Sequence, residues 1–310
     1  MSVLVIGFCG SMGKRRIRCL RRLNIEGVFG FDVHPQRDKI ADELGVELLD
    51  DIEDFPGKHV VISTPPDCHI EYSKLLLQRG YHVFCEASVV PDDRFHYPEL
   101  ELASSESGAL FFPSATIKFK DSVCYIKKQL KKIGEIHSYD YRFAQNLRTW
   151  HPEQDIMDFY VSKPETSASR EMTAFELSWL TSLFGSDATV CGAINVGLSE
   201  ISESSGINDT CVFLLSHDIG TVGSIAIDVF SHKPYRTLRI AGSNGNIEFD
   251  WIENYVKTYD VSGVLVDSYK EANTHVHEGY TQFSTEKMYD DELANFFMSS
   301  VTTLPIAECS

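Results

Sequence analysis

The stretch SVLVIGFCGSMGKRRIRCLRRLNIEGVFGFD, residues 2–32, decides the fold of this chain. It begins with the short apolar run Val3–Ile6, which is typical of a strand buried on both faces. Three glycines follow, and the basic segment Lys14–Arg22 then has the apolar spacing of a helix. A second apolar strand ends on Asp32. This order of strand, turn, helix and strand predicts a βαβ unit that binds a dinucleotide.

The glycines Gly7, Gly10 and Gly13 have the spacing G-x-x-G-x-x-G, which is one residue longer than the usual fingerprint. Glycines let the backbone turn sharply and approach a pyrophosphate, which the N–H groups at the start of the helix can bind. Asp32 lies 19 residues after Gly13, where a carboxylate can accept from both hydroxyls of the adenosine ribose. Since this carboxylate would repel a 2′-phosphate, the sequence favours NAD over NADP. The alternative for the glycines alone is a turn without a ligand.

The composition of the 310 residues, 43% hydrophobic and 24% charged, is that of a soluble globular protein. No apolar run approaches the roughly eighteen residues that span a bilayer, and no signal peptide precedes the first strand. We therefore expect a cytoplasmic protein. Eight scattered cysteines without a C-x-x-C pair indicate reduced thiols, and we expect no metal site.

The formal net charge of −17 falls almost entirely on the second half of the chain, after residue 132. An acidic half disfavours nucleic acid and anionic membranes as partners. It does not identify a substrate, and a solvated acidic surface explains it equally well.

Strands and helices alternate up to about residue 133, which predicts a doubly wound parallel sheet. Shorter apolar runs separated by Gly, Ser, Asn and Asp follow, and they suit an open, mostly antiparallel sheet covered on one face by a helix at Glu171–Phe184. A late helix is expected at Asp290–Ser300. The predicted fold is therefore α/β, with an N-terminal Rossmann domain at residues 1–118 and an α+β domain at residues 119–310. The helix Phe119–Ile133 would lie at their junction.

Four segments resemble the glucose–fructose oxidoreductase, inositol dehydrogenase and MocA family over nearly the whole chain. They are GFCGSMGKRRIRCL at 7–20, VVISTPPDCHIEY at 60–72, VFCEASVV at 83–90 and REMTAFELSWLTSLFG at 170–185. The resemblance implies a Rossmann domain followed by an open antiparallel sheet. It also implies NAD(P)-dependent oxidation or reduction of a sugar or cyclitol carbon, in a homo-oligomer that we expect to form through the C-terminal sheet.

The same resemblance assigns the residues of the cofactor site. Those around the phosphates and the adenosine ribose would be Gly7, Gly10, Ser11, Met12, Gly13 and Asp32. On the nicotinamide side the strand-turn-helix T-P-P-D-x-H would contribute Thr64, Pro65 and His69, and Glu86 would close over the site. His69 has an alternative interpretation as a polar residue in the first turn of a helix.

Two positions depart from the family pattern. Family members usually carry Glu-Lys-Pro where this chain has Glu86-Ala87-Ser88, and their lysine assists proton transfer. Their substrate-side helix usually carries an Asp and, four residues later, a His. Glu171 and Phe175 stand at these positions here. Both usual acid/base groups are therefore absent.

Another side chain must accept the hydroxyl proton as hydride leaves. The loop sequence Trp150-His151-Pro152 resembles that of a family subgroup with Glu-Ala-Ser, which makes His151 the first candidate and Glu171 its partner. His151 before Pro could instead order the loop, and Glu171 could be only a favourable acid in a first turn.

The substrate is expected to meet four further side chains. Trp150 and Tyr160 could stack on a sugar face or anchor the loop to the core. Arg170 and Lys118 could bind an anionic group, although Lys118 opens a lysine-rich helix and could simply be solvated.

Three functions fit these residues. The first is an NAD-dependent oxidoreductase acting on a sugar, sugar nucleotide or polyol. The second is a dinucleotide-binding sensor or partner subunit without catalysis, which the missing Lys and His favour. The third is an NAD-assisted lyase or glycosidase.

Family members usually continue into a final helix packed on the Rossmann domain. The chain ends at Ser310, so we expect that face to be open or covered by a partner.

Overall fold

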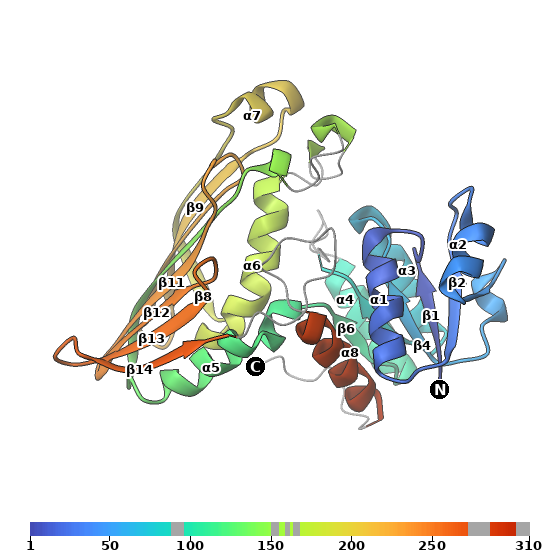
Figure 1. Cartoon of the computed structure of the whole chain (residues 1–310), viewed down its shortest axis with the longest axis horizontal. Coiled ribbons are helices and arrows are strands. Elements are labelled where there is room, and N and C mark those ends of the chain that lie inside the picture. The colour runs from blue at the N-terminus through green and yellow to red at the C-terminus, as the bar shows by residue number, and fades with distance from the viewer. Residues whose placement is uncertain (88–95, 150–154, 159–161, 164–167, 272–285, 302–310) are drawn as a thin grey trace. The chain divides into compact units, whose positions relative to one another are not determined.

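The computed structural model describes residues 1–87, 96–149, 155–158, 162–163, 168–271 and 286–301. These residues form two compact units. The first comprises Met1–Thr116 and the helix α8 (Glu286–Val301), and the second begins at Ile117. Figure 1 shows the first unit in blue to cyan with α8 in red, and the second in green to orange.

The first unit is built on a six-stranded parallel sheet, as the sequence predicts. The strand order is β3-β2-β1-β4-β5-β6. The order reverses between β1 and β4, and ligands of such sheets bind at this reversal, outside the carboxyl ends of the strands. The bounds are β1 (Ser2–Ile6), β2 (Gly27–Phe31), β3 (Glu47–Leu48), β4 (His59–Ile62), β5 (His82–Cys85) and β6 (Phe111–Pro113).

Helices cover both faces of this sheet because its central strands are apolar on both sides. Val3 and Val5 of β1 belong to a core that includes α1 (Ser11–Arg22), α2 (Arg37–Leu44) and α8. Leu4 and Ile6, which point the other way, belong to a second core with α3 (His69–Gln78) and α4 (His96–Ser107). The predicted N-terminal Rossmann fold is therefore confirmed.

The second unit is an eight-stranded, mostly antiparallel sheet with helices packed on one face. The helix α6 (Ala168–Phe184) contacts the strands at Thr210–His217 and Val222–Asp228, and α5 (Asp121–Leu130) contacts the three strands at the other end of the sheet. The short helix α7 (Glu200–Ser205) precedes β9. In sheet order the strands are β14 (Leu265–Lys270), β13 (Tyr255–Asp260), β12 (Gly245–Asp250), β11 (Tyr235–Gly242), β7 (Ile136–Ala144), β10 (Val222–Asp228), β9 (Thr210–His217) and β8 (Ala188–Val196).

The position of the last helix corrects one prediction. Residues 119–310 were expected to form the second domain, which would include the late helix predicted at Asp290–Ser300. Instead α8 packs against α1 in the first unit and buries Leu293 and Phe296 fully. The Phe296 ring lies 5.8 Å from Phe84 of β5. The late helix predicted at Asp290–Ser300 is therefore confirmed, but it belongs to the first unit and not to the second.

Candidate functional site

The glycine loop between β1 and α1 is tightly fixed by backbone contacts. Gly7 has a φ of +80°, which side chains other than glycine rarely adopt, and its N–H donates to the carbonyl of Phe31 at 2.9 Å. A Cβ on Gly13 would lie 2.3 Å from the Gly7 carbonyl oxygen. Gly7 and Gly13 are thus required by the fold of the loop. Gly10 differs, because a Cβ there meets only an ordinary contact at 3.5 Å.

The start of α1 is suited to an anion. Gly10 is its N-cap and provides no side-chain cap, and the first turn contains no acidic residue. The first four N–H groups of a helix have no partner within it, so they carry partial positive charge. Ser11 and Met12 form this first turn together with Gly13. A pyrophosphate fits this chemistry.

Asp32 is held at the carboxyl end of β2 by two backbone donors. The N–H of Cys9 donates to its Oδ2 at 2.8 Å and the N–H of His34 to its Oδ1 at 2.9 Å. The carboxylate is therefore tied directly to the glycine loop. Burial and the neighbouring Asp32 raise the pKa of the Cys9 thiol to about 12, so this thiol stays protonated at neutral pH. A carboxylate has further lone pairs with which to accept ribose hydroxyls.

Two hydroxyls at the end of β4 lack hydrogen-bond partners among the described residues. They are Ser63 Oγ and Thr64 Oγ1, and both atoms are buried. Such groups are costly unless a partner completes them. They lie beside the glycine loop, since a Cβ on Gly7 would come within 2.7 Å of the Ser63 carbonyl oxygen.

His69 lies behind this turn. Its ring is 1% exposed, and its Nε2 donates to the carbonyl oxygen of Thr64 at 2.9 Å. Because a carbonyl only accepts, this bond fixes the proton on Nε2. Burial lowers the pKa of His69 and keeps the ring neutral. His69 thus holds the Thr64-Pro65 turn, in which Pro65 precedes the short helix Pro66–Cys68.

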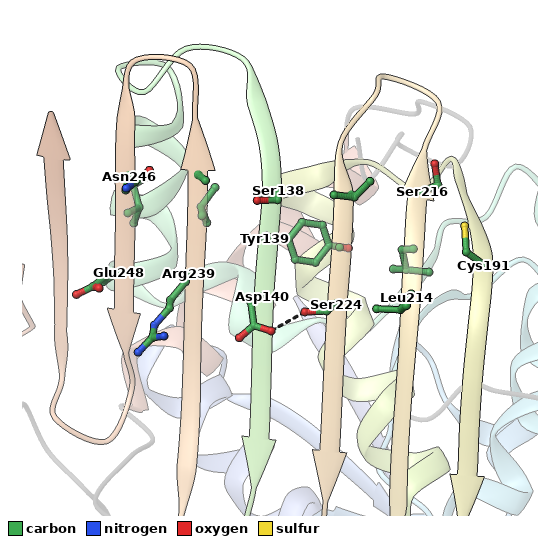
Figure 2. A pocket seen from close by; sticks show the side chains of 16 residues that line it. Ser138, Tyr139, Asp140, Cys191, Leu214, Ser216, Ser224, Arg239, Asn246 and Glu248 are labelled. Carbon is green, nitrogen blue, oxygen red and sulfur yellow. Dashed lines mark hydrogen bonds between the residues drawn. The ribbon is translucent and has the colours of Figure 1, made fainter. Parts of the chain in front are cut away.

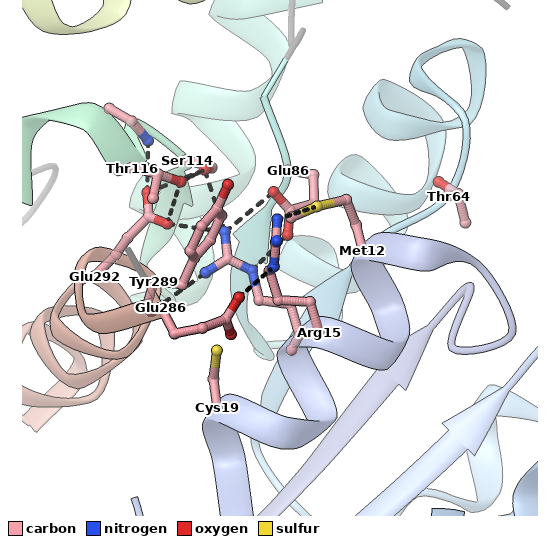
Figure 3. A network of polar contacts seen from close by, with 12 residues as sticks. Met12, Arg15, Cys19, Thr64, Glu86, Ser114, Thr116, Glu286, Tyr289 and Glu292 are labelled. Carbon is pink, nitrogen blue, oxygen red and sulfur yellow. Dashed lines mark hydrogen bonds and ion pairs between the residues drawn. The ribbon is translucent and has the colours of Figure 1, made fainter. Parts of the chain in front are cut away.

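Glu86 follows β5 and is bound to a buried arginine (Figure 3). Arg16 Nε donates to Glu86 Oε1 at 2.5 Å, and Nη2 donates to Oε2 at 3.1 Å. Arg16 also reaches Glu292 of α8, where Nη2 donates to Oε2 at 2.8 Å. The sequence analysis described Lys14–Arg22 only as a basic helical segment and singled out neither Arg16 nor Glu292. The signal available in the sequence was one charged residue among apolar positions on each of the two helices, Arg16 on α1 and Glu292 on α8.

The carboxyl ends of β1, β2, β4 and β5 therefore bring together the predicted cofactor residues of the first unit. The glycine loop, the helix start, the tethered Asp32 and the two unpaired hydroxyls fit a dinucleotide lying along this edge of the sheet.

The predicted substrate residues belong to the second unit or lie outside the described residues. Trp150, His151 and Tyr160 are in the latter group. Arg170 and Glu171 lie in the first turn of α6, where Glu171 is buried, and Lys118 lies in the 3-10 turn Thr116–Phe119. The pairing of His151 with Glu171 stays a prediction.

A buried acid that the sequence analysis missed lies one turn further along α6. Glu176 is fully buried and accepts from Tyr141 Oη at 2.5 Å and Trp179 Nε1 at 2.8 Å. Arg236 forms an ion pair with it and stacks on the Trp251 ring, with 4.0 Å between the guanidinium carbon and the ring centroid. Burial and the Glu176 carboxylate raise the pKa of Tyr141, which stays the donor. The sequence F-E-L-S-W, an acid within an apolar helix, was the available signal.

The opposite face of the second sheet carries a shallow hollow of about 710 Å³ (Figure 2). Its floor carries a row of charges of alternating sign, because Arg239 of β11 is in register with both Asp140 of β7 and Glu248 of β12. Ser224 Oγ donates to Asp140. Leu214 and Val222, each 53% exposed, are apolar side chains in its lining.

In the described part of the chain, none of the helices is long and apolar enough to cross a membrane. The His, Cys, Asp and Glu side chains of this part form no cluster of three or more that could hold a metal ion.

Several solved structures of dehydrogenases and reductases have a fold similar to that of this chain. A levoglucosan dehydrogenase in complex with NADH and L-sorbose superposes with a TM-score of 0.81 at 16% identity, covering 99% of this chain and 91% of that one. A UDP-N-acetylglucosamine 3-dehydrogenase from Acidithiobacillus ferrooxidans gives 0.73 at 16% identity, covering 99% and 90%. A biliverdin reductase from Synechocystis with biliverdin and NADP+ gives 0.70 at 17% identity, covering 99% and 92%. At these identities the likeness concerns the fold alone.

No curated protein matches the sequence. Residues 1–91 match the family model described as an oxidoreductase family with an NAD-binding Rossmann fold, GFO_IDH_MocA. This match spans Asp32 and three of the four segments on which the resemblance rests, residues 7–20, 60–72 and 83–90. The N-terminal part of the chain, residues 1–91, is therefore similar to the NAD-binding Rossmann domain of the Gfo/Idh/MocA oxidoreductase family.

Proposed function

We propose that the protein is an NAD-dependent oxidoreductase that transfers a hydride to or from a carbon of a sugar, sugar nucleotide or polyol. The observation that carries this proposal is the cofactor edge of the first unit, where the glycine loop, Asp32 and the unpaired hydroxyls of Ser63 and Thr64 converge. Bound NAD would supply the hydride chemistry. The carbohydrate-acting dehydrogenases of the same fold support the substrate class.

The chain's own residues would bind and orient the cofactor. The N–H groups at the start of α1 would bind the pyrophosphate, and Asp32 would accept from the adenosine ribose. His69 would keep the Thr64 turn in place from behind. For the proton we retain His151 as acid/base residue with Glu171 as its partner, and Lys118, Trp150, Tyr160 and Arg170 as substrate-binding residues.

Replacing His151 by Ala tests this acid/base role. General acid–base groups contribute about 10²- to 10⁴-fold to rate, so we expect turnover to fall at least about a hundredfold. NADH should bind with unchanged affinity by calorimetry. The assay is the nicotinamide absorbance with a panel of carbohydrates, together with product analysis. Undiminished turnover would exclude the role. NAD binding by wild type without any product would favour the sensor, and product without net NADH would favour the lyase or glycosidase.

Preference for NAD over NADP should depend on Asp32. Its backbone carbonyl accepts from Arg37 Nη1 at 3.2 Å, so a guanidinium is already nearby. In Asp32→Ser the repulsion of a 2′-phosphate is removed while this cation stays. We expect the ratio of the Kd values for NADP and NAD to fall by at least about tenfold, measured by titration. The control Asp50→Asn removes the exposed ion-pair partner of Arg37 and should change that ratio less than about threefold. An unchanged ratio in Asp32→Ser would contradict the assignment.

The hollow in the second sheet is proposed as the contact between two copies of the chain. The row Asp140, Arg239, Glu248 is self-complementary, because a twofold axis could place each Arg239 near the carboxylates of the other copy. The exposed Leu214 and Val222 would be buried there. Sedimentation should show a dimer or larger for wild type and monomers for Arg239→Glu. Monomeric wild type at micromolar concentration would refute this contact.

A further inference from the structure

The carboxyl edge of β5 and β6 contains a buried charge cluster whose charges do not balance (Figure 3). Its members are Glu86, Arg16 and Glu292, from the end of β5, from α1 and from α8. Arg16 and Glu292 are fully buried, and Glu86 is 8% exposed. Two carboxylates therefore share one guanidinium, away from water.

Both carboxylates are bound as acceptors. Glu292 Oε1 accepts from the backbone N–H of Ala115 at 2.7 Å, and its Oε2 accepts from Arg16 at 2.8 Å and Thr116 Oγ1 at 2.7 Å. Ser114 Oγ donates to Oε1 at 3.0 Å. Burial raises the pKa of Glu292, while these donors act against that rise. Because each Glu292 oxygen accepts from an N–H group that can only donate, Glu292 is best satisfied as a carboxylate.

The other ion pairs between α1 and α8 in the described part of the chain do not compensate the excess. Arg15 and Arg22 of α1 form ion pairs with Glu286 of α8, and Arg22 also pairs with Asp290. The two cations Arg15 and Arg22 are therefore balanced by the two anions Glu286 and Asp290. The Tyr289 phenol and the Cys19 thiol face the same cluster, and burial raises the pKa of both, so they are neutral at neutral pH. Among the residues that the structure describes, one negative charge of the Glu86–Arg16–Glu292 triad therefore stays uncompensated.

The triad lies at the part of the edge where the nicotinamide half of a dinucleotide would lie. The phosphates belong at the loop after β1 and the adenosine ribose at Asp32 after β2, so the cofactor extends toward β4 and β5. Glu86 is adjacent to the Ser63-Thr64 turn, since its N–H donates to the carbonyl of Ile62 at 3.0 Å. Within the triad only Glu86 reaches the surface.

We propose that Arg16 and Glu292 are positioning residues that hold Glu86 at this edge, and that the uncompensated charge of the triad favours the oxidised nicotinamide over the reduced one. The oxidised ring is a cation and the reduced ring is neutral, so only the first is attracted. The last helix of the chain would thereby influence the redox balance of the bound cofactor through Glu292. This inference rests on the proposed dinucleotide-binding function.

The test compares the Kd values of NAD+ and NADH for the full chain, measured by calorimetry. In Glu292→Gln, Glu86 and Arg16 balance each other. We therefore expect the ratio of Kd for NAD+ to Kd for NADH to rise about tenfold, which is ~1.4 kcal/mol. Glu86→Gln removes the same charge from the more exposed end of the triad and should raise the ratio likewise. If Glu292→Gln does not fold, the ratio of Kd values is measured with Glu86→Gln instead.

The matched control is Glu286→Gln, which makes the same chemical change on the same helix but at a carboxylate that binds Arg15 and Arg22 and does not belong to the triad. Its ratio should stay within about twofold of wild type. Equal loss of both affinities in Glu292→Gln and Glu86→Gln, or no change in either, would overturn the inference and leave the proposed function intact. Wild type that binds neither nucleotide would contradict the proposed function itself.

Discussion

Replacing Arg16 by Met is expected to destabilise the first unit by about 3–5 kcal/mol. Methionine fills much of the same volume, but it leaves Glu86 and Glu292 facing each other without the guanidinium that both bind. Each is buried, so water cannot take over the lost hydrogen bonds. A buried pair is strongly destabilised when one partner is removed, because the other charge stays in a medium of low dielectric. Protonation of one carboxyl group would limit the loss at acidic pH.

Arg22→Met is the matched control for this change. Arg22 lies on the same helix and also binds carboxylates of α8, but its side chain is 39% exposed. Exposed ion pairs contribute about 1 kcal/mol or less, so the expected loss is small. Chemical denaturation followed by circular dichroism would give both free energies of unfolding. Similar values for the two variants would show that burial of the Arg16 charge does not determine its contribution.

The first unit was predictable because its decisive signals are local. The apolar strand, the glycine loop and Asp32 lie within 31 consecutive residues, and the loop geometry follows from the spacing of Gly7 and Gly13. The alternation of strands and helices then specifies a parallel sheet without knowledge of distant contacts.

The triad was not predictable for the opposite reason. Arg16 is 70 residues from Glu86 and 276 from Glu292, and an arginine in a basic helix is usually solvated. Only the fold shows that α8 returns to the first unit and buries these charges together. The same applies to Glu176, whose partners Tyr141 and Arg236 come from two strands of the second sheet.

The choice of His151 as acid/base residue rests neither on a local sequence pattern nor on a long-range contact in the fold. His151 was selected because the usual Lys and His of the family are replaced here by Ala87 and Phe175. Both replacements are read directly from the sequence. Which side chain pairs with His151 depends on which one lies near it in space, and a loop sequence without periodicity does not predict this.

Replacing Gly13 by Ala is expected to reduce NAD affinity about a thousandfold while the sheet of the first unit persists. The added Cβ would lie 2.3 Å from the Gly7 carbonyl oxygen and 2.6 Å from Phe8 Cα. Both atoms are backbone, so the strain is relieved only if α1 moves away from the loop. The first-turn N–H groups would then point past the pyrophosphate. Hydrogen bonds to charged groups are worth about 1.5–3 kcal/mol each, and the loss of two gives the expected factor.

Gly10→Ala separates this effect from a general intolerance of side chains in the loop. Gly10 has a φ of −72°, and its added Cβ would make only the 3.5 Å contact with Gly7, so its unfolding temperature should equal that of wild type. Gly13→Ala should unfold at a lower temperature, since overpacking costs about 1–3 kcal/mol. Titration with NADH should show a smaller loss of affinity for Gly10→Ala than for Gly13→Ala. If Gly13→Ala binds like wild type, the pyrophosphate does not lie at the start of α1, because the helix cannot both move and keep its contacts with the phosphates.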